Sequence, residues 1–261
     1  MTDFTHTTLR HVNKPTHRLG LAINFGLDDV GVEAALDRGL TYVFFQRSRT
    51  GKALPGLRRA IKRNRERLIL AGGPSLGFFA GSVRRGCEAL LKTFDTDYLD
   101  VFQLFWLSKM SAWTPAVVEA LVKLRDEGKV RSIGVSIHDR PRAGRLAEDS
   151  PLDVFMLRYN AAHPGAEHDV FPHLERRRPS VVAYTATSWR KLLKAPRGWS
   201  GPTMTAGDCY RFCLSSKHVD VVLCGPESVS QLDENLAALE KGPLTPDEAT
   251  WMREYGRLVH G

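Results

Sequence analysis

Short apolar runs alternate with amphipathic stretches along most of the chain. The apolar runs are rich in Val, Ile, Leu and Phe, which is typical of parallel strands buried on both faces. The predicted strands are His17–Phe25, Thr41–Phe45, Leu68–Ala71, Leu99–Trp106, Arg131–Ile137, Leu152–Tyr159, Val181–Ala186 and Val219–Cys224. Helical periodicity is clearest at Val30–Arg38, Ser82–Phe94, Pro115–Glu127, His168–Arg178 and Ser228–Glu240. The chain therefore consists of repeated strand–helix units.

The ends of one predicted helix carry clear sequence signals. Thr114 precedes Pro115, so a hydroxyl can cap the first turn while proline occupies the first helical position, where no N–H is needed. Gly128 follows the last apolar turn and fits the left-handed residue that often ends a helix. We expect a helix that begins at Pro115 and ends at Glu127.

Eight strand–helix units favour a (β/α)8 TIM barrel, an α/β fold with its functional residues at the carboxyl ends of the strands. The alternative is a doubly wound open sheet. A G-x-G-x-x-G motif after the first strand would favour that sheet, but Leu19–Gly26 holds only isolated glycines. We expect a single domain over residues 1–261, with an N-terminal tail at 1–16 and a C-terminal helix at 243–261 that packs on the barrel.

Composition agrees with one large core. The 261 residues are 43% hydrophobic and 25% charged. Met1–Gly20 lacks the apolar segment of a signal peptide, and no apolar run reaches the length of about eighteen residues that a membrane span needs, so we expect a cytoplasmic protein without a membrane partner. The 4 cysteines form no Cys-x-x-Cys pair and are expected to be reduced and buried.

The net charge of +8 raises the question of an anionic partner. Much of the positive charge lies in Leu57–Arg67, a predicted amphipathic helix with a solvated basic face, and in Arg176–Arg178. Neither run contains interleaved aromatic residues or a nucleic-acid motif, so no nucleic-acid partner is expected. A small ligand that carries a phosphate remains compatible with the charge.

Several motifs, in order, resemble the aldo-keto reductases. They are Thr96–Trp106 (TDYLDVFQLFW), Gly128–Ser136 (GKVRSIGVS), Arg158–Asn160 (RYN), Val182–Thr185 and Gly225–Asn235 (GPESVSQLDEN). The likeness runs from His17 onward. It implies the aldo-keto reductase type of (β/α)8 barrel, an oxidoreductase activity and NADP(H) as the cofactor.

The resemblance also implies four catalytic residues, an Asp, a Tyr, a Lys and a His, which together deliver a proton to a carbonyl as hydride arrives. The motifs place the Asp at Phe44, the Tyr within Arg47–Thr50, the Lys at Gly72 or Gly73 and the His at Phe105. None of the four polar residues is present, so the chain is identified as a divergent member.

Part of the cofactor site implied by the resemblance is retained. The matching positions are Ser136, Tyr184, Thr185, Gly225, Ser228, Gln231, Glu234 and Asn235. Ile137 and Met156 stand where the family has amide side chains, and Gln231 stands where strong NADP binders have an arginine. Ser228 and Asn235 also fit purely structural roles as a helix cap and a backbone partner.

Polar residues at predicted strand ends are the candidates for replacing the missing chemistry. His138, Tyr184, Arg47 and Arg158 are the catalytic candidates, and Gln46, Trp106 and Asn160 are the candidate substrate pocket. His138 titrates near neutral pH, although an exposed loop histidine is the alternative. Either arginine can hold a carboxylate or a phosphate through two parallel hydrogen bonds, and a salt bridge at the barrel end is its alternative role.

Three functions follow from these residues. The first is a nicotinamide-dependent oxidoreductase whose proton donor is His138 or a water beside Tyr184. The second is a non-redox isomerase, cyclase, lyase or dehydratase that uses the same polar residues. The third is a catalytically silent protein that binds a ligand or nucleotide. In each case the partner is a small molecule. The chain is taken as a monomer, with a dimer left open.

The loop after the sixth predicted strand contains residue types that bind metals. Pro164 and Gly165 interrupt the spacing of His163, Glu167 and His168, which matches no known zinc motif. A carboxylate near a helix N-terminus accounts for Glu167 more simply. No metal is predicted.

Overall fold

The computed structural model describes residues 3–46 and 51–260. Its centre is a closed parallel barrel with the strand order β10-β3-β4-β5-β6-β7-β8-β9, which confirms the predicted (β/α)8 architecture over the open sheet. The strands are β3 (Leu19–Ala22), β4 (Tyr42–Phe44), β5 (Ile69–Gly72), β6 (Leu99–Leu104), β7 (Val130–Ile137), β8 (Val154–Arg158), β9 (Ser180–Tyr184) and β10 (Val221–Cys224). Each overlaps its predicted run.

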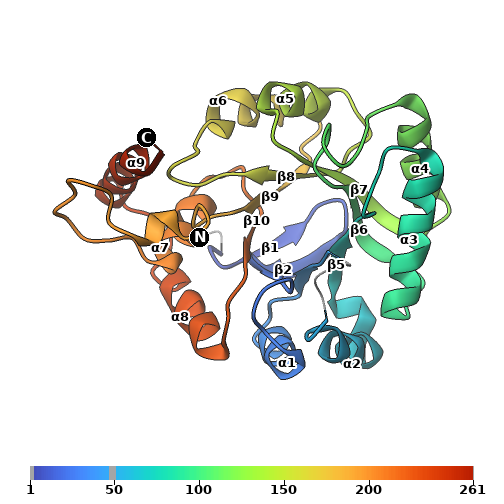
Figure 1. The fold of residues 1–261 in the computed structure, drawn as a ribbon, viewed down its shortest axis with the longest axis horizontal. Helices are drawn as coiled ribbons and strands as arrows, with labels where there is room; N and C mark the ends of the chain where they lie inside the picture. The colour runs from blue at the N-terminus through green and yellow to red at the C-terminus, as the bar shows by residue number, and fades with distance from the viewer. Residues whose placement is uncertain (1–2, 47–50, 261) are drawn as a thin grey trace.

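Helices surround the barrel (Figure 1). They are α1 (Asp29–Asp37), α2 (Leu54–Asn64), α3 (Ala80–Phe94), α4 (Pro115–Asp126), α5 (Arg140–Glu148), α6 (Ala166–Asp169), α7 (Ala206–Leu214), α8 (Val229–Leu239) and α9 (Pro246–His260), with short 3-10 turns η2 (Arg65–Arg67), η3 (Phe171–His173) and η4 (Lys191–Leu193). Thr114 caps α4 as predicted, and Gly128 has a φ of 73°. No helix within the described ranges has the length and apolar character needed to cross a membrane.

The predicted helix His168–Arg178 is wrong. The chain there forms only the four-residue α6, leaves helical geometry at Val170 with a φ of −130°, and then makes the turn η3. Pro172 lies in the middle of the predicted helix, and proline there lacks the N–H that a continuing helix needs and clashes with the preceding turn. The basic run Arg176–Arg178 therefore lies in a turn rather than at a helix end.

The expected tail at residues 1–16 is largely ordered as a hairpin. β1 (His6–Leu9) pairs antiparallel with β2 (Lys14–His17). Leu9 and Val12 pack in one buried cluster with side chains from the interior of the barrel. Lys14 Nζ lies 2.9 Å from Asp100 Oδ1 and donates to the carbonyl of Leu68 at 2.8 Å. The hairpin thus closes the end of the barrel opposite the carboxyl ends of the strands, and it is seen across the barrel in Figure 1.

Alternation along the strands decides which side chains face the barrel interior. One buried cluster collects every second residue, including Ala22, Phe44, Phe105, Met156 and Leu223, with Tyr184 packed against it. The same alternation continues to the carboxyl end of each strand and one or two residues beyond it. It therefore identifies, for each strand, the last residue whose side chain points into the barrel. These positions, which we call the mouth, are Asn24, Gln46, Gly73, Phe105, His138, Arg158, Tyr184 and Gly225.

Candidate active site at the barrel mouth

Two of the predicted catalytic residues are joined at the mouth. Tyr184 ends β9 and His138 directly follows β7. Tyr184 Oη lies 3.0 Å from His138 Nε2, and the two rings meet edge to face with centroids 6.0 Å apart. A phenol and an imidazole in direct hydrogen bond form a path along which a proton can move.

The surroundings of this pair set its protonation states. Burial, and then the positive charge of Arg158, lower the pKa of His138 below its usual range. Burial raises the pKa of Tyr184 to about 12, against the opposing effect of the Arg158 charge. At neutral pH the pair therefore consists of an uncharged imidazole and an intact phenol.

Arg158 ends β8, between the strands that carry His138 and Tyr184, and its Cα is the register partner of Tyr184. Its side chain is partly buried. Across residues 3–46 and 51–260, neither a hydrogen bond nor an ion pair within 4.0 Å engages its guanidinium. The mouth thus contains a positive charge that this part of the chain does not balance.

Aromatic side chains line the other side of the mouth. Phe44 and Phe105 meet edge to face, with ring centroids 5.8 Å apart. Trp106 is 47% exposed, and its ring centroid lies 5.6 Å from that of His138. Its φ of 45° is unusual for a bulky residue, and buried Ser111 steadies the loop by donating to the carbonyl of Phe105 at 2.7 Å. The wall beside the His138–Tyr184 pair is therefore apolar.

Glycines at the end of β5 leave no room for side chains. A Cβ on Gly73 would lie 2.0 Å from the carbonyl oxygen of Gln103, and one on Gly72 would lie 2.6 Å from the ring of Phe45. Contacts this short require backbone or ring movement. Neither position can carry a cation in this backbone arrangement.

The predicted phosphate end of the cofactor site lies at the N-terminus of α8. Ser228 caps the helix by accepting from the N–H of Gln231 at 3.2 Å, and Gln231 Oε1 accepts from the N–H of Glu227 at 2.9 Å. Both side chains are exposed, and the first turn contains no acidic residue. The helix dipole and free N–H groups of such a turn suit a phosphate. Gly225 is required beside it, because a Cβ there would meet the Phe25 ring at 2.7 Å.

The predicted nicotinamide end lies inside the barrel. Ser136 faces inward on β7 and is 8% exposed. Met156 accepts a hydrogen bond from Gln103 Nε2 at 3.0 Å, so the buried amide of Gln103 is turned toward a thioether. Thr185 donates to the carbonyl of Tyr184 at 2.7 Å. Ser136 and the ring of Tyr184 are the groups here that fit a carboxamide and a flat ring.

The remaining predicted residues have more structural surroundings. Asn160 is fully buried, and its amide donates to the carbonyl of Thr185 at 2.8 Å and accepts from the N–H of Ala162 at 3.0 Å. It joins two loops and both ends of its amide are engaged, so its place in the substrate pocket stays a prediction. Asn235 is also buried, at 7% exposure, while Glu234 accepts from Ser230 at 3.4 Å. Arg47 lies outside the described residues.

Sequence reasoning missed two supporting residues near the mouth. Asn24 accepts from the N–H of Gln46 at 3.0 Å and so fixes the ends of β3 and β4 relative to each other. Asp139 caps α5 by accepting from the N–H of Arg142 at 3.0 Å. The period-two pattern that identifies Gln46 as inward would also have identified Asn24.

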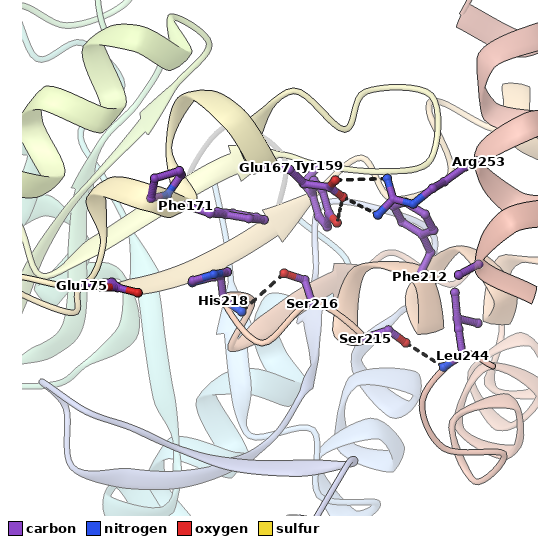
Figure 2. A pocket seen from close by; sticks show the side chains of 12 residues that line it. Tyr159, Glu167, Phe171, Glu175, Phe212, Ser215, Ser216, His218, Leu244 and Arg253 are labelled. Atoms are coloured by element: carbon purple, nitrogen blue, oxygen red, sulfur yellow. Dashed lines mark hydrogen bonds and ion pairs between the residues drawn. The ribbon is translucent and has the colours of Figure 1, made fainter. Parts of the chain in front are cut away.

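A hollow lies outside the barrel, with a volume of about 470 Å³. We call it the outer groove; side chains from the α6–η3 region, the end of α7 and α9 line it (Figure 2). Tyr159 donates to Glu167 at 2.7 Å, and both terminal nitrogens of Arg253 reach the same carboxylate at 2.8 and 3.1 Å. Among residues 3–46 and 51–260, no group of three His, Cys, Asp or Glu side chains forms a metal-binding cluster.

Comparisons with known proteins decide the family. The sequence model described as "Aldo/keto reductase family" matches residues 27–194. The chain belongs to the aldo/keto reductase family. Among solved structures, aldo-keto reductase AKR11C1 from Bacillus halodurans in its holo form superposes with a TM-score of 0.80 at 20% identity, covering 96% of each chain. An aldo/keto reductase from Klebsiella pneumoniae, in complex with NADP and acetate, has a TM-score of 0.77 at 24% identity and covers 94% of this chain and 93% of that one.

Curated relatives in the aldo/keto reductase family match parts of the chain. The NADH-specific methylglyoxal reductase of Escherichia coli is 28% identical over 214 residues, or 68% of this chain and 65% of the relative. Methylglyoxal reductase YeaE of the same organism is 30% identical over 102 residues, or 38% of this chain and 35% of the relative. The chain therefore spans less than two thirds of the length of these relatives. They support membership of an oxidoreductase family, and the substrate of this chain does not follow from them.

Proposed function

We propose that this aldo/keto reductase is an NADP(H)-dependent oxidoreductase of a small molecule in which Tyr184 and His138 relay the proton. The observation that carries the proposal is the 3.0 Å contact between Tyr184 Oη and His138 Nε2 at the mouth. Phe44, Gly73 and Phe105 offer no polar group at the positions where the motifs place the family's catalytic residues. The relay supplies the proton transfer that those positions lack.

The residues present fit a nicotinamide dinucleotide. The exposed first turn of α8, with Ser228 and Gln231, would hold the adenosine phosphate, and Gly225 would allow close approach of the chain. Ser136 would bind the carboxamide and Tyr184 would contact the ring. When bound, the cofactor supplies the hydride or accepts it.

The high pKa of Tyr184, about 12, makes a free phenolate costly at neutral pH. A relay avoids that species. As an alcohol is oxidised, its hydroxyl proton passes to Tyr184 Oη while the proton of Tyr184 passes to His138 Nε2. The substrate loses one hydride and one proton and becomes a carbonyl, and His138 becomes an imidazolium. Reduction runs the same steps backward.

The lowered pKa of His138 sets the pH preference of each direction. The imidazole is uncharged at neutral pH, so it is ready to accept a proton from an alcohol. Carbonyl reduction requires the imidazolium, whose population grows as the pH falls through the lowered pKa. The site is therefore better prepared for oxidation at neutral pH and for reduction in acid.

The test begins with binding. NADPH is titrated into the protein, and its fluorescence reports the complex. Oxidation of an alcohol panel with NADP⁺ is then compared among wild type, His138→Ala and Tyr184→Phe. We expect cofactor binding in all three proteins and a large loss of turnover in both variants. Unchanged turnover in both variants rejects the relay, and absence of NADPH binding rejects the redox function.

A second function uses the same pair without hydride transfer. Ile137 and Met156 place apolar side chains where the motifs of the family have amides, which weakens the hold on a nicotinamide carboxamide. The alternative is an isomerase or lyase in which His138 moves a proton next to a carbonyl. Proton exchange on a carbonyl compound in D2O, dependent on His138 and independent of NADP(H), would favour it.

A further inference from the structure

We propose that the substrate is a 2-hydroxy or 2-oxo monocarboxylic acid whose carboxylate binds the guanidinium of Arg158. The redox part of this statement rests on the proposed function, whereas carboxylate recognition does not. No residue of the described chain satisfies this guanidinium, although it ends a strand at the mouth between the residues of the proton relay.

Other buried or partly buried arginines have defined partners. Arg65 contacts Asp100 at 2.8 Å, Arg140 contacts Asp169 at 2.8 Å, and Arg211 contacts Glu248 at 2.7 Å. Arg18 donates to carbonyl oxygens, including that of Leu214 at 3.0 Å. Removing a guanidinium from water without such partners is unfavourable. Arg158 departs from this pattern at the place where a ligand would enter.

The geometry of adjacent strands selects the position of the reacting group. Arg158 and Tyr184 are register partners on β8 and β9, so their side chains start side by side at the mouth. The charge of Arg158 also lies close enough to act on both Tyr184 and His138. A carboxylate held by Arg158 would therefore bring the next carbon of the ligand toward the proton relay. That carbon carries the hydroxyl of a 2-hydroxy acid and the carbonyl of a 2-oxo acid.

Charge and polarity define the rest of the substrate. One planar guanidinium matches one carboxylate through two parallel N–H···O bonds. The facing wall of Phe44, Phe105 and Trp106 is apolar and suits a hydrocarbon side chain. We therefore expect an aromatic or branched side chain in place of a second charged group.

The experiment separates carboxylate recognition from catalysis. Phenyllactate and its uncharged amide are titrated into the full chain by calorimetry, with and without NADPH, and lactate and lactamide form a second pair. NADPH cannot accept hydride from a hydroxy acid, so no turnover occurs. We expect wild type to bind phenyllactate at least about tenfold more tightly than the amide, as for a charge-assisted contact.

Variants identify the residue responsible. Arg158→Gln should abolish the preference for the acid, and Arg158→Lys should retain part of it because the charge remains without the fork. Arg253→Gln, which removes an arginine already paired in the outer groove, serves as the matched control and should leave the preference intact.

Three results overturn the inference: equal binding of acid and amide in both pairs, a preference that survives in Arg158→Gln, or no binding of any probe at about 10 mM, roughly tenfold above the upper end of typical KM values. Its failure is distinguishable from failure of the proposed function. A retained acid preference without NADPH binding supports carboxylate recognition and rejects oxidation, whereas NADP⁺-dependent oxidation of uncharged alcohols with no acid preference does the reverse.

Discussion

The mouth of the barrel and the outer groove each contain a tyrosine and an arginine, but these side chains have different hydrogen-bond and ion-pair partners in the two places. In the outer groove, Tyr159 and Arg253 share the carboxylate of Glu167. At the mouth, Tyr184 is bonded to His138, and Arg158 has no carboxylate partner in the chain as described. An arginine that is neutralised within the chain stabilises the fold, whereas one that is left without a partner is available to a ligand.

The comparison also separates the roles of the two tyrosines. Burial and the neighbouring Glu167 raise the pKa of Tyr159 well above its usual range, so its proton remains on the phenol and serves a fixed hydrogen bond. Tyr184 is hydrogen-bonded to the imidazole of His138, which is uncharged at neutral pH because its pKa is lowered, and which can therefore accept a proton. Only the tyrosine at the mouth has a neighbour that can take its proton.

The largest expected effect is on turnover. His138→Ala removes the proton acceptor and should lower kcat about 10²–10⁴-fold, as is typical when a general base is lost. NADPH affinity should change little. Steady-state kinetics and NADPH titration measure the two quantities. In the outer groove, the matched substitution His218→Ala should leave kcat unchanged, and equal losses in both variants would remove the functional distinction between the regions.

Gly73→Ala tests how tightly the mouth is packed. The new methyl group would lie 2.0 Å from the carbonyl oxygen of Gln103, so the strand ends must move. We expect a loss of about 1–3 kcal/mol in the free energy of unfolding, measured by urea denaturation. Gly51→Ala is the control, because a Cβ there meets nothing within 4 Å. Similar stabilities for the two variants would contradict the packing described for β5.

The pH dependence of kcat/KM tests the lowered pKa of His138 in the free enzyme. Oxidation needs the uncharged imidazole, so kcat/KM should be constant at neutral pH and fall about tenfold per pH unit below a midpoint under 6.5. The groups that face the His138 imidazole are the phenol of Tyr184 on β9, the charge of Arg158 on β8 and the uncharged ring of Trp106. The neighbouring carboxylate of Asp139 caps α5 instead. A midpoint above 6.5 would contradict the burial and the Arg158 charge.

The smallest effect concerns stability. Arg253→Gln breaks the pair with Glu167, in which the two side chains are 48% and 24% exposed, so solvent screening limits the loss to about 0.5–1 kcal/mol. Arg158→Gln should cost less or be neutral, because no ion pair is broken. Urea denaturation of both variants compares them. A larger loss for Arg158→Gln would show that the mouth arginine stabilises the fold.

The sequence was sufficient to predict the barrel because every strand has its own apolar run. Strand parity also places Gln46, His138, Arg158 and Tyr184 at the mouth without any structure. What it could not provide is the contact between Tyr184 and His138, which depends on two strands that are separated by another strand and by 46 residues of sequence.

The failures have equally specific causes. The predicted helix His168–Arg178 is disrupted around Pro172, whose effect periodicity does not register. The hairpin β1–β2 is short and partly polar, so it does not resemble a buried strand. The assignment of Asn160 to the substrate pocket rests on its place at a strand end and stays a prediction, while the structure shows that its amide bonds the backbone of two loops. Strand-end position alone does not tell a structural amide from a ligand-binding one.

The close approach of Gly73 to the Gln103 carbonyl has a consequence for the redesign of this barrel. Any side chain at residue 73 requires the backbone to shift first. A single substitution that introduces a cation there would therefore bring a folding defect together with its new chemistry. New functional groups are more readily introduced at the ends of β7, β8 and β9.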